Sequence, residues 1–413
     1  MEYQNRQLEN MVRYAYNHTK YYRRLFESIG FNPNVDSLRK YFPFIPITTK
    51  TEYTHNKNDF ISDEFDIRNL ETIRTSGSTG TVLSVYWNKS DYLKSAIDMW
   101  RDRSRFGINS QSRVCYFHTI LKTNVGDGES VITSPKMFMP NSYTMTFSKM
   151  QFDCSSLEYY YRKMQEFRPE WLLCYPTTLY LFVEFMIKKG YKLPQSIRYI
   201  ELMGESVLPY QKHLIQSFFG SNLPVRVLYG MRETNGLAVE NDDKNMYVFS
   251  NNAFLEIETH GRVAKYGDYG NIIVTSLTNR AMPFIRYKTG DSGSLKPGNG
   301  KRDVLKIVNG RLNELVKCEG GETLESCIWF YIVEYINNIY NDCIKQFRVV
   351  QNDYTEFGVV LNITNRDFCT EIENTFVQQA EKYGIKAKWE FSYVGNIEPE
   401  ENGKLRYFIN NIP

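Results

Sequence analysis

The chain has 413 residues, more than the roughly 250–300 that one hydrophobic core usually supports, so we expect one large domain and at least one smaller one. Its composition, 42% hydrophobic and 23% charged, is that of a globular protein, and a net charge of +3 gives no overall field for holding nucleic acid or an anionic membrane surface. Seven scattered cysteines without a Cys-x-x-Cys pair, a polar N-terminus and the lack of any run of about 20 apolar residues predict a cytoplasmic protein without disulfides, signal peptide or membrane span.

The N-terminal region has a helical pattern. Apolar side chains recur at helical spacing over residues 5–29 and Gly30 is a suitable stop, which predicts one amphipathic helix. A proline-punctuated extended segment covers residues 41–47. Thr48 or Thr49 is then predicted to cap a short helix.

A loop rich in glycine and hydroxyl residues follows, with the sequence Thr75-Ser76-Gly77-Ser78-Thr79-Gly80. Its two glycines allow a tight turn and a close approach of the backbone to a ligand, and its hydroxyl and N–H groups can donate to phosphate oxygens. The alternative is an ordinary surface turn. The loop lacks the Gly-Lys-Ser/Thr ending of a Walker A motif, which argues against P-loop NTPase chemistry.

Strand-like and helix-like segments alternate from about residue 71 to residue 308. The expected strands are Arg113–His118, Glu170–Tyr175, Ile197–Met203 and Val225–Tyr229, and the expected helices are Leu157–Glu166, Thr178–Lys189 and Pro209–Phe218. This alternation predicts a large layered α/β domain with a substantially parallel sheet. Residues 247–307 are predicted to form a β-rich subdomain with strands at Phe254–Thr259, Gly270–Ser276, Phe284–Tyr287 and Val304–Val308.

A new pattern begins after the turn dipeptide Asn309-Gly310. It reads as helix Glu325–Ile339, strands Gln346–Gln351 and Gly358–Ile363, helix Phe368–Tyr383 and strand Lys388–Val394. These elements predict a small α+β domain. We therefore expect an N-terminal domain of residues 1–308 and a mobile C-terminal domain of residues 309–413, with a hinge at 309–310.

Polar and glycine residues stand where several expected strands end, which is where α/β sheets commonly bind ligands. In chain order they are Gly204, Glu205, Tyr229, Gly230, Arg232, Glu233, Asp291, Arg311 and, near the C-terminus, Lys404. Glu233 is a candidate for a hard cation such as Mg²⁺, and Arg311 and Lys404 for negative charge. Each of them alone has an ordinary structural alternative, and their occurrence together in one order strengthens the functional interpretation.

Together, the Ser/Thr-Gly loop, Tyr229-Gly230-x-x-Glu233, Tyr287-x-Thr-Gly-Asp291, Gly310-Arg311 and Gly403-Lys404 resemble the adenylate-forming acyl-CoA synthetase superfamily. Within it, Tyr14-Ala15-Tyr16-Asn17, Pro46-Ile47-Thr48-Thr49-Lys50 and Cys174-Tyr175-Pro176-Thr177 resemble the phenylacetate-CoA ligase/CapK-like branch. The resemblance implies the adenylating two-domain fold of this superfamily. It also implies an AMP-forming reaction, in which a carboxylate attacks the α-phosphate of ATP and the acyl group then moves to an acceptor.

The resemblance also implies a role for each matched residue. Loop 75–80 would embrace the β- and γ-phosphates, Gly204, Glu205, Tyr229 and Gly230 would line the adenine site, and Asp291 and Arg311 would hold the ribose. Glu233 would bind Mg²⁺, Arg232 would contact phosphate, and Lys404 would stabilise charge between carboxylate and α-phosphate. The acyl pocket is expected at Tyr175, Thr177, Met203 and Met231.

The chain departs from the family pattern at three of these motifs, first after the Ser/Thr-Gly loop, where Val82 stands in place of the usual proline. Arg232 replaces a threonine, and Asn313 replaces the hinge carboxylate. Residues 240–248 lack the cysteines and histidines of a zinc site that some relatives carry, so no zinc is expected. These replacements leave adenylation expected and place the second half-reaction in question.

The acceptor and the oligomeric state stay open. CoA, a sugar amine and a carrier protein are the acceptor alternatives, since CapK-like relatives are associated with surface polysaccharide pathways. A catalytically silent nucleotide- or acyl-binding protein on the same fold is the alternative to an enzyme. Unrelated phosphoryl transfer has little support, because no Walker A or kinase lysine motif is present.

Overall fold

The computed structural model describes residues 2–74, 83–118, 132–133, 144–148, 154–192, 194–204, 207, 209–298, 302–311, 315–319, 323–326, 328–340, 343–398 and 406–412. The chain divides into two compact units, one of Met1–Thr289 with Gly293–Ile307 and the other of Gly290–Ser292 with Val308–Pro413. Each unit is described by itself below. A search for membrane-spanning helices through the described residues finds none of sufficient length and apolarity.

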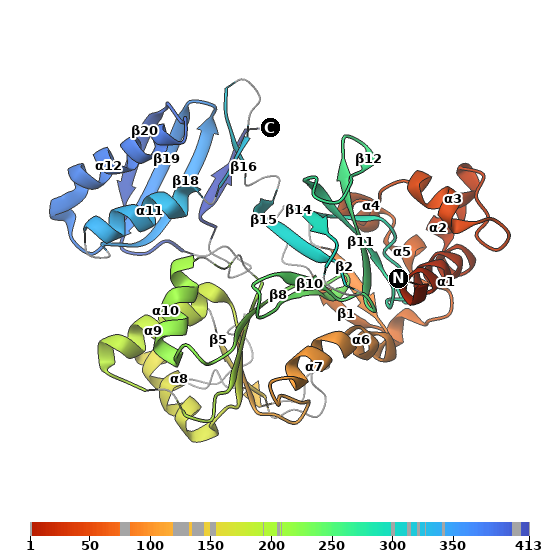
Figure 1. The fold of residues 1–413 in the computed structure, drawn as a ribbon, viewed down its shortest axis with the longest axis horizontal. Helices are drawn as coiled ribbons and strands as arrows, with labels where there is room; N and C mark the ends of the chain where they lie inside the picture. Colours follow the sequence, from red (N-terminus) through yellow and green to blue (C-terminus); the bar gives the residue numbers. More distant parts are fainter. Residues whose placement is uncertain are drawn as a thin grey trace. The chain divides into compact units, whose positions relative to one another are not determined.

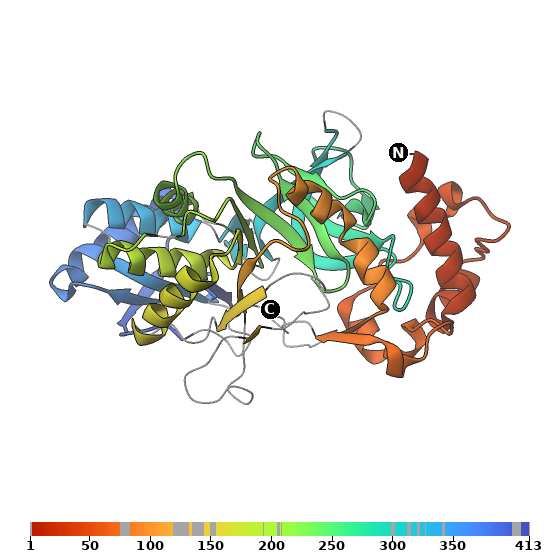
Figure 2. The ribbon, with the colours of Figure 1, turned by 90° about the horizontal axis from the view of Figure 1, so that it is seen from below.

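Two helices, not one, form the N-terminus. Helix α1 (Glu2–His18) and helix α2 (Lys20–Ser28) lie side by side, as Figure 2 shows in red. The predicted single helix over residues 5–29 is wrong because Thr19 is extended, with φ of −128°, and its hydroxyl accepts a hydrogen bond from the Tyr22 N–H. Thr19 thus caps a second helix where the pattern suggested continuation.

The predicted cap at Thr48 or Thr49 is confirmed at Thr49. Its side chain accepts from the Glu52 N–H, and the Glu52 carboxylate accepts from the Thr49 N–H, which completes a capping box. This cap begins α4 (Lys50–His55). The other short helices of this region are α3 (Leu38–Tyr41), α5 (Lys57–Phe60), η1 (Phe42–Phe44) and η2 (Ile67–Asn69).

A large mixed sheet dominates the first unit (Figure 1). Its strands follow one another in the order β12 (Arg262–Val263), β11 (Ala253–Thr259), β13 (Gly270–Ser276), β14 (Tyr287–Lys296), β15 (Val304–Arg311), β10 (Met246–Val248), β9 (Asn235–Glu240), β8 (Val225–Met231), β7 (Tyr199–Met203), β6 (Trp171–Cys174), β3 (Val114–His118), β5 (Thr144–Ser148) and β4 (Ile132–Thr133). Strands β5, β3, β6, β7 and β8 are parallel, whereas β8 through β10 and β15 pair antiparallel. We call β5, β3, β6, β7 and β8 the parallel half and all the strands from β9 to β12, in the order above, the antiparallel half, and β8 joins the two.

Helices cover both faces of the parallel half, which confirms the predicted layered α/β class. Figure 1 shows α8 (Cys154–Phe167), α9 (Pro176–Lys189) and α10 (Pro209–Phe219) on one side, and α6 (Lys89–Ser95) and α7 (Ile97–Ser104) on the other. Because strand side chains alternate, Cys115 and Phe117 pack in the core with α8 to α10. Val114 and Tyr116 pack in a second core with Trp100 of α7.

The β-rich part contains one error of prediction. Residues Phe284–Arg286 are not a strand, and β14 begins only at Tyr287. Arg286 has a positive φ of 47°, which extended strand backbone does not allow. A separate hairpin of β1 (Glu71–Arg74) and β2 (Ser84–Trp87) brackets the glycine-rich loop, with Arg74 opposite Ser84.

The second unit is a compact α+β structure. Its sheet has the order β20 (Lys388–Tyr393), β19 (Glu356–Ile363), β18 (Ile344–Asp353) and β21 (Phe408–Asn410), and α11 (Ile328–Ile339) and α12 (Cys369–Lys382) lie side by side on one face (Figure 1). Trp329 of α11 packs against Phe357 and Phe376 in its core. A short 3₁₀ helix, η5 (Arg366–Phe368), precedes α12.

Two local predictions for this unit are wrong. Asn309 and Gly310 lie in strand β15 and form no turn. Glu325 ends β17 (Thr323–Glu325), which pairs with β16 (Leu315–Lys317), so α11 begins three residues later than predicted. The side chain of Gln351 ties this hairpin to β18, since it accepts from the Lys317 N–H at 3.0 Å and donates to the Lys317 carbonyl at 2.6 Å.

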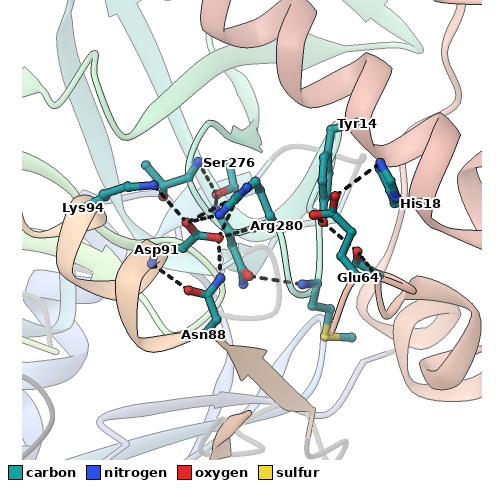
Figure 3. Close-up of polar contacts among 12 residues, drawn as sticks. Tyr14, His18, Glu64, Asn88, Asp91, Lys94, Ser276 and Arg280 are labelled. Atoms are coloured by element: carbon teal, nitrogen blue, oxygen red, sulfur yellow. Dashed lines mark hydrogen bonds and ion pairs between the residues drawn. The ribbon is translucent and has the colours of Figure 1, made fainter. Parts of the chain in front are cut away.

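A buried carboxylate anchors α6 to the loop before β14 (Figure 3). Asp91 is 1% exposed and accepts side-chain hydrogen bonds from Arg280, the shorter ones from Nε to Oδ2 at 3.1 Å and from Nη2 to Oδ1 at 3.2 Å. The guanidinium of Arg280 also lies 5.7 Å from the ring centroid of Tyr14 in α1. Arg280 therefore connects α6 with α1, and it fixes the helix that carries Tyr92.

Candidate active site

The candidate site residues fall into two groups, those that the structure describes and those that it does not. Loop 75–80, Glu205 and Lys404 lie outside the described residues, as does the side chain of Arg311. Asp291 lies in β14, in the short stretch Gly290–Ser292 that belongs to the second unit. The geometry below concerns the remaining candidates, all of which lie in the first unit.

The carboxyl ends of three neighbouring parallel strands bring the predicted adenine and acyl residues to one edge of the sheet. Tyr175 follows β6, Met203 ends β7 and is followed by Gly204, and Met231 ends β8. The register pairs Cys174 with Leu202 and Met203 with Leu228, so the ends of β6 and β7 are nearly level and β8 extends three residues further, to Met231. Such an edge is where open α/β sheets bind ligands.

The ring of Tyr175 lies directly against the backbone of Gly204. A Cβ atom at position 204 would lie 2.6 Å from Cε1 of Tyr175, a distance that no side chain tolerates, and the φ of Gly204 is 84°. Glycine is therefore required here for both space and conformation. The contact forms a flat aromatic wall beside a bare backbone, an arrangement suited to a planar ligand group.

A tight hairpin between β8 and β9 presents Arg232 and Glu233. The register shifts between Tyr229 and Gly230, and a Cβ atom at Gly230 would lie 2.7 Å from the Asn235 carbonyl oxygen. Asn235 has a φ of 66°, and its amide donates to the Ser95 hydroxyl of α6 at 2.9 Å. The hairpin is thus held by α6 as well as by its own strands.

The backbone at Arg232 is fixed from β2. The indole Nε1 of the buried Trp87 donates to the Arg232 carbonyl at 3.0 Å, and the Trp87 ring packs edge-on against Tyr92 at 5.3 Å. Arg232 itself is half-buried. Its position is therefore determined from a strand that borders the glycine-rich loop.

Three buried tyrosines surround this part of the edge: Tyr92, Tyr116 and Tyr175. Burial raises the pKa of Tyr116, and Tyr175, which shares a hydrogen bond with it, acts in the same direction, while the Arg232 charge opposes both. Burial likewise raises the pKa of Tyr92, again opposed by Arg232. The phenols of Tyr92 and Tyr116 therefore stay protonated at neutral pH and offer hydroxyl groups close to the Arg232 cation.

Sequence reasoning missed Tyr92 and Tyr116. Alternation along β3 offered a signal for Tyr116, because it shares the sheet face of Val114. Tyr92 lies in a helix that the sequence pattern did not predict. The remaining acyl-pocket candidates are partly buried: Thr177 accepts from the Gln211 amide at 3.3 Å, and Met203 and Met231 pack against core clusters.

Glu233 is the buried carboxylate of the site. It is 5% exposed, and its Oε1 accepts a hydrogen bond from the Tyr287 hydroxyl at 3.0 Å. Among the described residues, no group of three or more His, Cys, Asp or Glu side chains could hold a metal ion. One carboxylate fits Mg²⁺ bound mainly through nucleotide phosphates and water, since Mg²⁺ typically uses one or two carboxylates at such sites.

Comparisons with known proteins find relatives along the whole chain. A family model described as the CapK C-terminal domain matches residues 325–411. The chain is 23% identical over 426 residues to Protein CapK of Staphylococcus aureus, covering 100% of this chain and 89% of that protein. It is 24% identical over 300 residues to a phenylacetate-coenzyme A ligase of Thermus thermophilus, covering 70% of this chain and 64% of that protein.

The fold matches solved adenylate-forming ligases. A 2-hydroxyisobutyryl-CoA ligase in the postadenylation state, in complex with R3-HIB-AMP, aligns with a TM-score of 0.76 and 16% identity over 98% of this chain and 88% of that one. The relatives, the family model and the solved structure together support the adenylate-forming superfamily, in its CapK and phenylacetate-CoA ligase-like branch. The predicted two-domain adenylating fold is confirmed.

A cavity of about 750 Å³ elsewhere in this adenylate-forming fold is not part of the site. It lies between the ends of α9 and α10 and includes Tyr191, Ile197, Phe218 and Leu223 in its lining. Ile197 and Leu223 precede β7 and β8. The cavity is therefore at the amino-terminal edge of the parallel strands, opposite the edge that carries Gly204 and Glu233.

Proposed function

We propose that this chain activates a carboxylic acid with ATP, forming an acyl-adenylate and pyrophosphate. The observation that carries the proposal is the buried Glu233 carboxylate, placed in the hairpin after β8 and next to the strand edge of Gly204 and Tyr175. In the reaction, a carboxylate oxygen bonds to the α-phosphorus of ATP, and the bond from that phosphorus to the β-phosphate bridge breaks. Pyrophosphate carries the leaving electron pair.

The first unit would hold the reactants. The bare backbone at Gly204, with Glu205 next to it, and the segment Tyr229-Gly230 would line the adenine site. Loop 75–80 would hold the β- and γ-phosphates through its N–H and hydroxyl groups. Tyr175, Thr177, Met203 and Met231 would border the acyl group, and the guanidinium of Arg232 would contact phosphate.

Glu233 would hold Mg²⁺, which would neutralise charge on the phosphates while the bond to the α-phosphorus forms. The site chemistry fits this assignment, because a buried carboxylate in a fixed orientation suits an ion that takes its other ligands from nucleotide and water. The absence of zinc stays a prediction.

The second unit would complete the site. Asp291 and Arg311 would hold the ribose, and Lys404 would stabilise negative charge between the carboxylate and the α-phosphate. Catalysis would then require residues 309–413 to act as a mobile domain that closes on residues 1–308, a common gating step.

The acceptor of the acyl group is a further part of the proposal. CoA is supported by the relatives named as coenzyme A ligases. An amine or carrier acceptor in surface polysaccharide biosynthesis is the alternative, and it rests on the resemblance of the sequence motifs to the CapK-like branch alone. The protein would encounter either type of acceptor in the cytoplasm, where we expect it to act. A catalytically silent binding protein remains the competing function, motivated by Arg232 and Asn313.

ATP–pyrophosphate exchange across aryl, fatty, hydroxy and amino acids tests adenylation. We expect one acid class to support exchange, and Lys404→Ala to lower it by about 10²–10³-fold, as removal of a charge-stabilising group does in other enzymes. Lys388→Ala is the matched control, because Lys388 is 86% exposed and belongs to the same unit. Product formation with CoA, amino sugars or carrier protein then identifies the acceptor.

Two outcomes decide between the functions. ATP binding without exchange for any acid, unchanged in Lys404→Ala and Glu233→Ala, would establish the silent binding protein. Exchange that depends on both residues establishes the ligase.

A further inference from the structure

The hydrogen bond between Tyr287 and Glu233 joins two motifs that are 54 positions apart in the chain. The Tyr287 hydroxyl donates to Oε1 of Glu233 at 3.0 Å, and the two residues are 1% and 5% exposed. A glutamate has several rotatable bonds, so a fixed donor restricts which way its carboxylate points. Because both groups are buried, solvent does not replace the donor easily.

Tyr287 is itself held by the N-terminal segment that precedes α4. The backbone of Thr48 forms a parallel bridge with Tyr287, since the Thr48 N–H donates to the Arg286 carbonyl and its own carbonyl accepts from the Lys288 N–H, each at 2.9 Å. The Thr48 hydroxyl donates to the Ile285 carbonyl at 2.9 Å. These bonds fix the backbone on both sides of the tyrosine.

Arg286 completes the support. Its φ of 47° is unusual for a residue other than glycine, and such a conformation persists where the surroundings hold it in place. The buried guanidinium pairs with Glu256, Nε to Oε2 at 3.2 Å, and donates to the Pro43 carbonyl at 2.9 Å. The positive φ turns the chain immediately before Tyr287 and sends it into β14.

We propose that Tyr287 is a positioning residue that orients the Glu233 carboxylate for the metal-bound nucleotide. Thr48 and Arg286 hold Tyr287 in place for this task. The inference rests on the proposed function, because it assumes that Glu233 serves Mg²⁺. Carboxylates that bind metals are commonly held by such hydrogen-bond partners, and the loss of one typically lowers metal affinity about 10–100-fold.

The test measures binding, not turnover. The dissociation constant of a non-hydrolysable ATP analogue, α,β-methylene-ATP, is determined by calorimetry once with Mg²⁺ and once with EDTA. The value with EDTA divided by the value with Mg²⁺ reports how much the metal strengthens binding. We expect Tyr287→Phe to lower this ratio about tenfold or more, with the EDTA value unchanged. Phenylalanine keeps the ring contacts with Tyr53 and Phe284, whose centroids lie 5.4 and 5.2 Å away.

Tyr53→Phe is the matched control. Tyr53 is a buried tyrosine in the same aromatic cluster, and its hydroxyl bonds to the Pro283 carbonyl at 2.7 Å and to Tyr22 at 2.6 Å. The Tyr53→Phe variant loses a buried hydroxyl, as the Tyr287→Phe variant does, so a general loss of stability would lower the ratio equally in both variants. We expect the wild-type ratio in Tyr53→Phe, and circular dichroism melts verify that both variants are folded.

Glu233→Gln separates the inference from the function on which it rests. A wild-type ratio in Tyr287→Phe together with a lost ratio in Glu233→Gln overturns the positioning role and leaves the proposed function intact. A wild-type ratio in Glu233→Gln removes the metal role of Glu233, and the positioning role with it. In the double variant we expect no further loss beyond Glu233→Gln, because the hydroxyl acts through that carboxylate.

Discussion

Apolar clusters pack on both halves of the large sheet, and the halves differ in the number of chain segments that their buried arginines connect. The parallel half, β5 to β8, is covered on both faces by apolar clusters, and its strand ends supply glycine backbone and aromatic walls. The antiparallel half carries polar supports that connect distant segments, such as Arg286 with the carbonyls of residues 42, 43 and 45. Glu233 lies in the hairpin where the halves meet.

This difference suggests that the two halves contribute different properties to the candidate site. Apolar packing tolerates many substitutions of similar volume, whereas a polar support fails when one partner is removed. The part of the site whose shape would accommodate a planar ligand group, the contact of Gly204 with the Tyr175 ring, lies on the parallel half. The carboxylate that needs a fixed direction is held from the antiparallel half by Tyr287.

Arg286→Met gives the largest expected effect. It leaves Glu256 as a buried charge without its partner, which we expect to lower the free energy of unfolding by about 3–5 kcal/mol. Urea unfolding followed by circular dichroism measures it. Adding Glu256→Leu is expected to restore only part of the loss, since the carbonyls of Phe42, Pro43 and Ile45 still lack the Arg286 donor.

The matched pair in the parallel half is Arg103 with Glu201. Arg103 lies 4.8 Å from the rings of both Trp100 and Trp171, and its Nε donates to Glu201 at 3.0 Å. Arg103→Met combined with Glu201→Leu is expected to recover to within about 1–2 kcal/mol of wild type, because apolar replacement of a buried pair is often neutral. Equal recovery of the two double variants would contradict the proposed difference between the halves.

Gly204→Ala tests the shape-determined edge. Gly220→Ala is its control, because Gly220 has a similar φ of 98° and nothing within 4 Å of an added Cβ, whereas Gly204 faces the Tyr175 ring. We expect unfolding free energies lowered by about 1 kcal/mol at Gly220 and about 2–3 kcal/mol at Gly204. Exchange kinetics should show a raised KM for the acid or ATP in Gly204→Ala alone, and equal effects of both variants would remove the special role of this contact.

Arg280→Met is expected to have a smaller effect, about 1–2 kcal/mol, although its partner Asp91 is 1% exposed. Asp91 keeps the Asn88 amide and Lys94 as partners, and Arg280 is 40% exposed, so solvent compensates for part of the loss. Urea unfolding beside Arg286→Met measures the difference. A loss as large as that of Arg286→Met would show that burial of the carboxylate alone determines the effect.

The sequence predicted the strands β3, β6, β7 and β8 and the helices α8 to α10 of the parallel half, because their signals are local, but it missed β5, α6 and α7. Alternating strands and helices such as β6 and α9 were located within a few residues, and the glycines at strand ends marked the edge. The antiparallel half was predicted less well, since its decisive contacts are long-range: nothing near Arg286 in the chain reveals the carbonyls some 240 positions away. The sequence motif included Tyr287, but its hydrogen bond to Glu233, 54 positions away, could be recognised only in the folded structure.

The buried thiols of the parallel half give the smallest expected effect, one on reactivity without a change in stability. Cys115 and Cys174 lie in the adjacent strands β3 and β6, and burial raises the pKa of both thiols. Because the thiolate is the nucleophile, we expect iodoacetamide to modify the exposed Cys154 in the native protein and to leave the two buried thiols intact until urea unfolds the chain. Peptide mass mapping over time measures this order. Native-state labelling of Cys115 at the rate of Cys154 would mean that the parallel half opens locally, and the contrast between a closed apolar half and a polar supporting half would then be wrong.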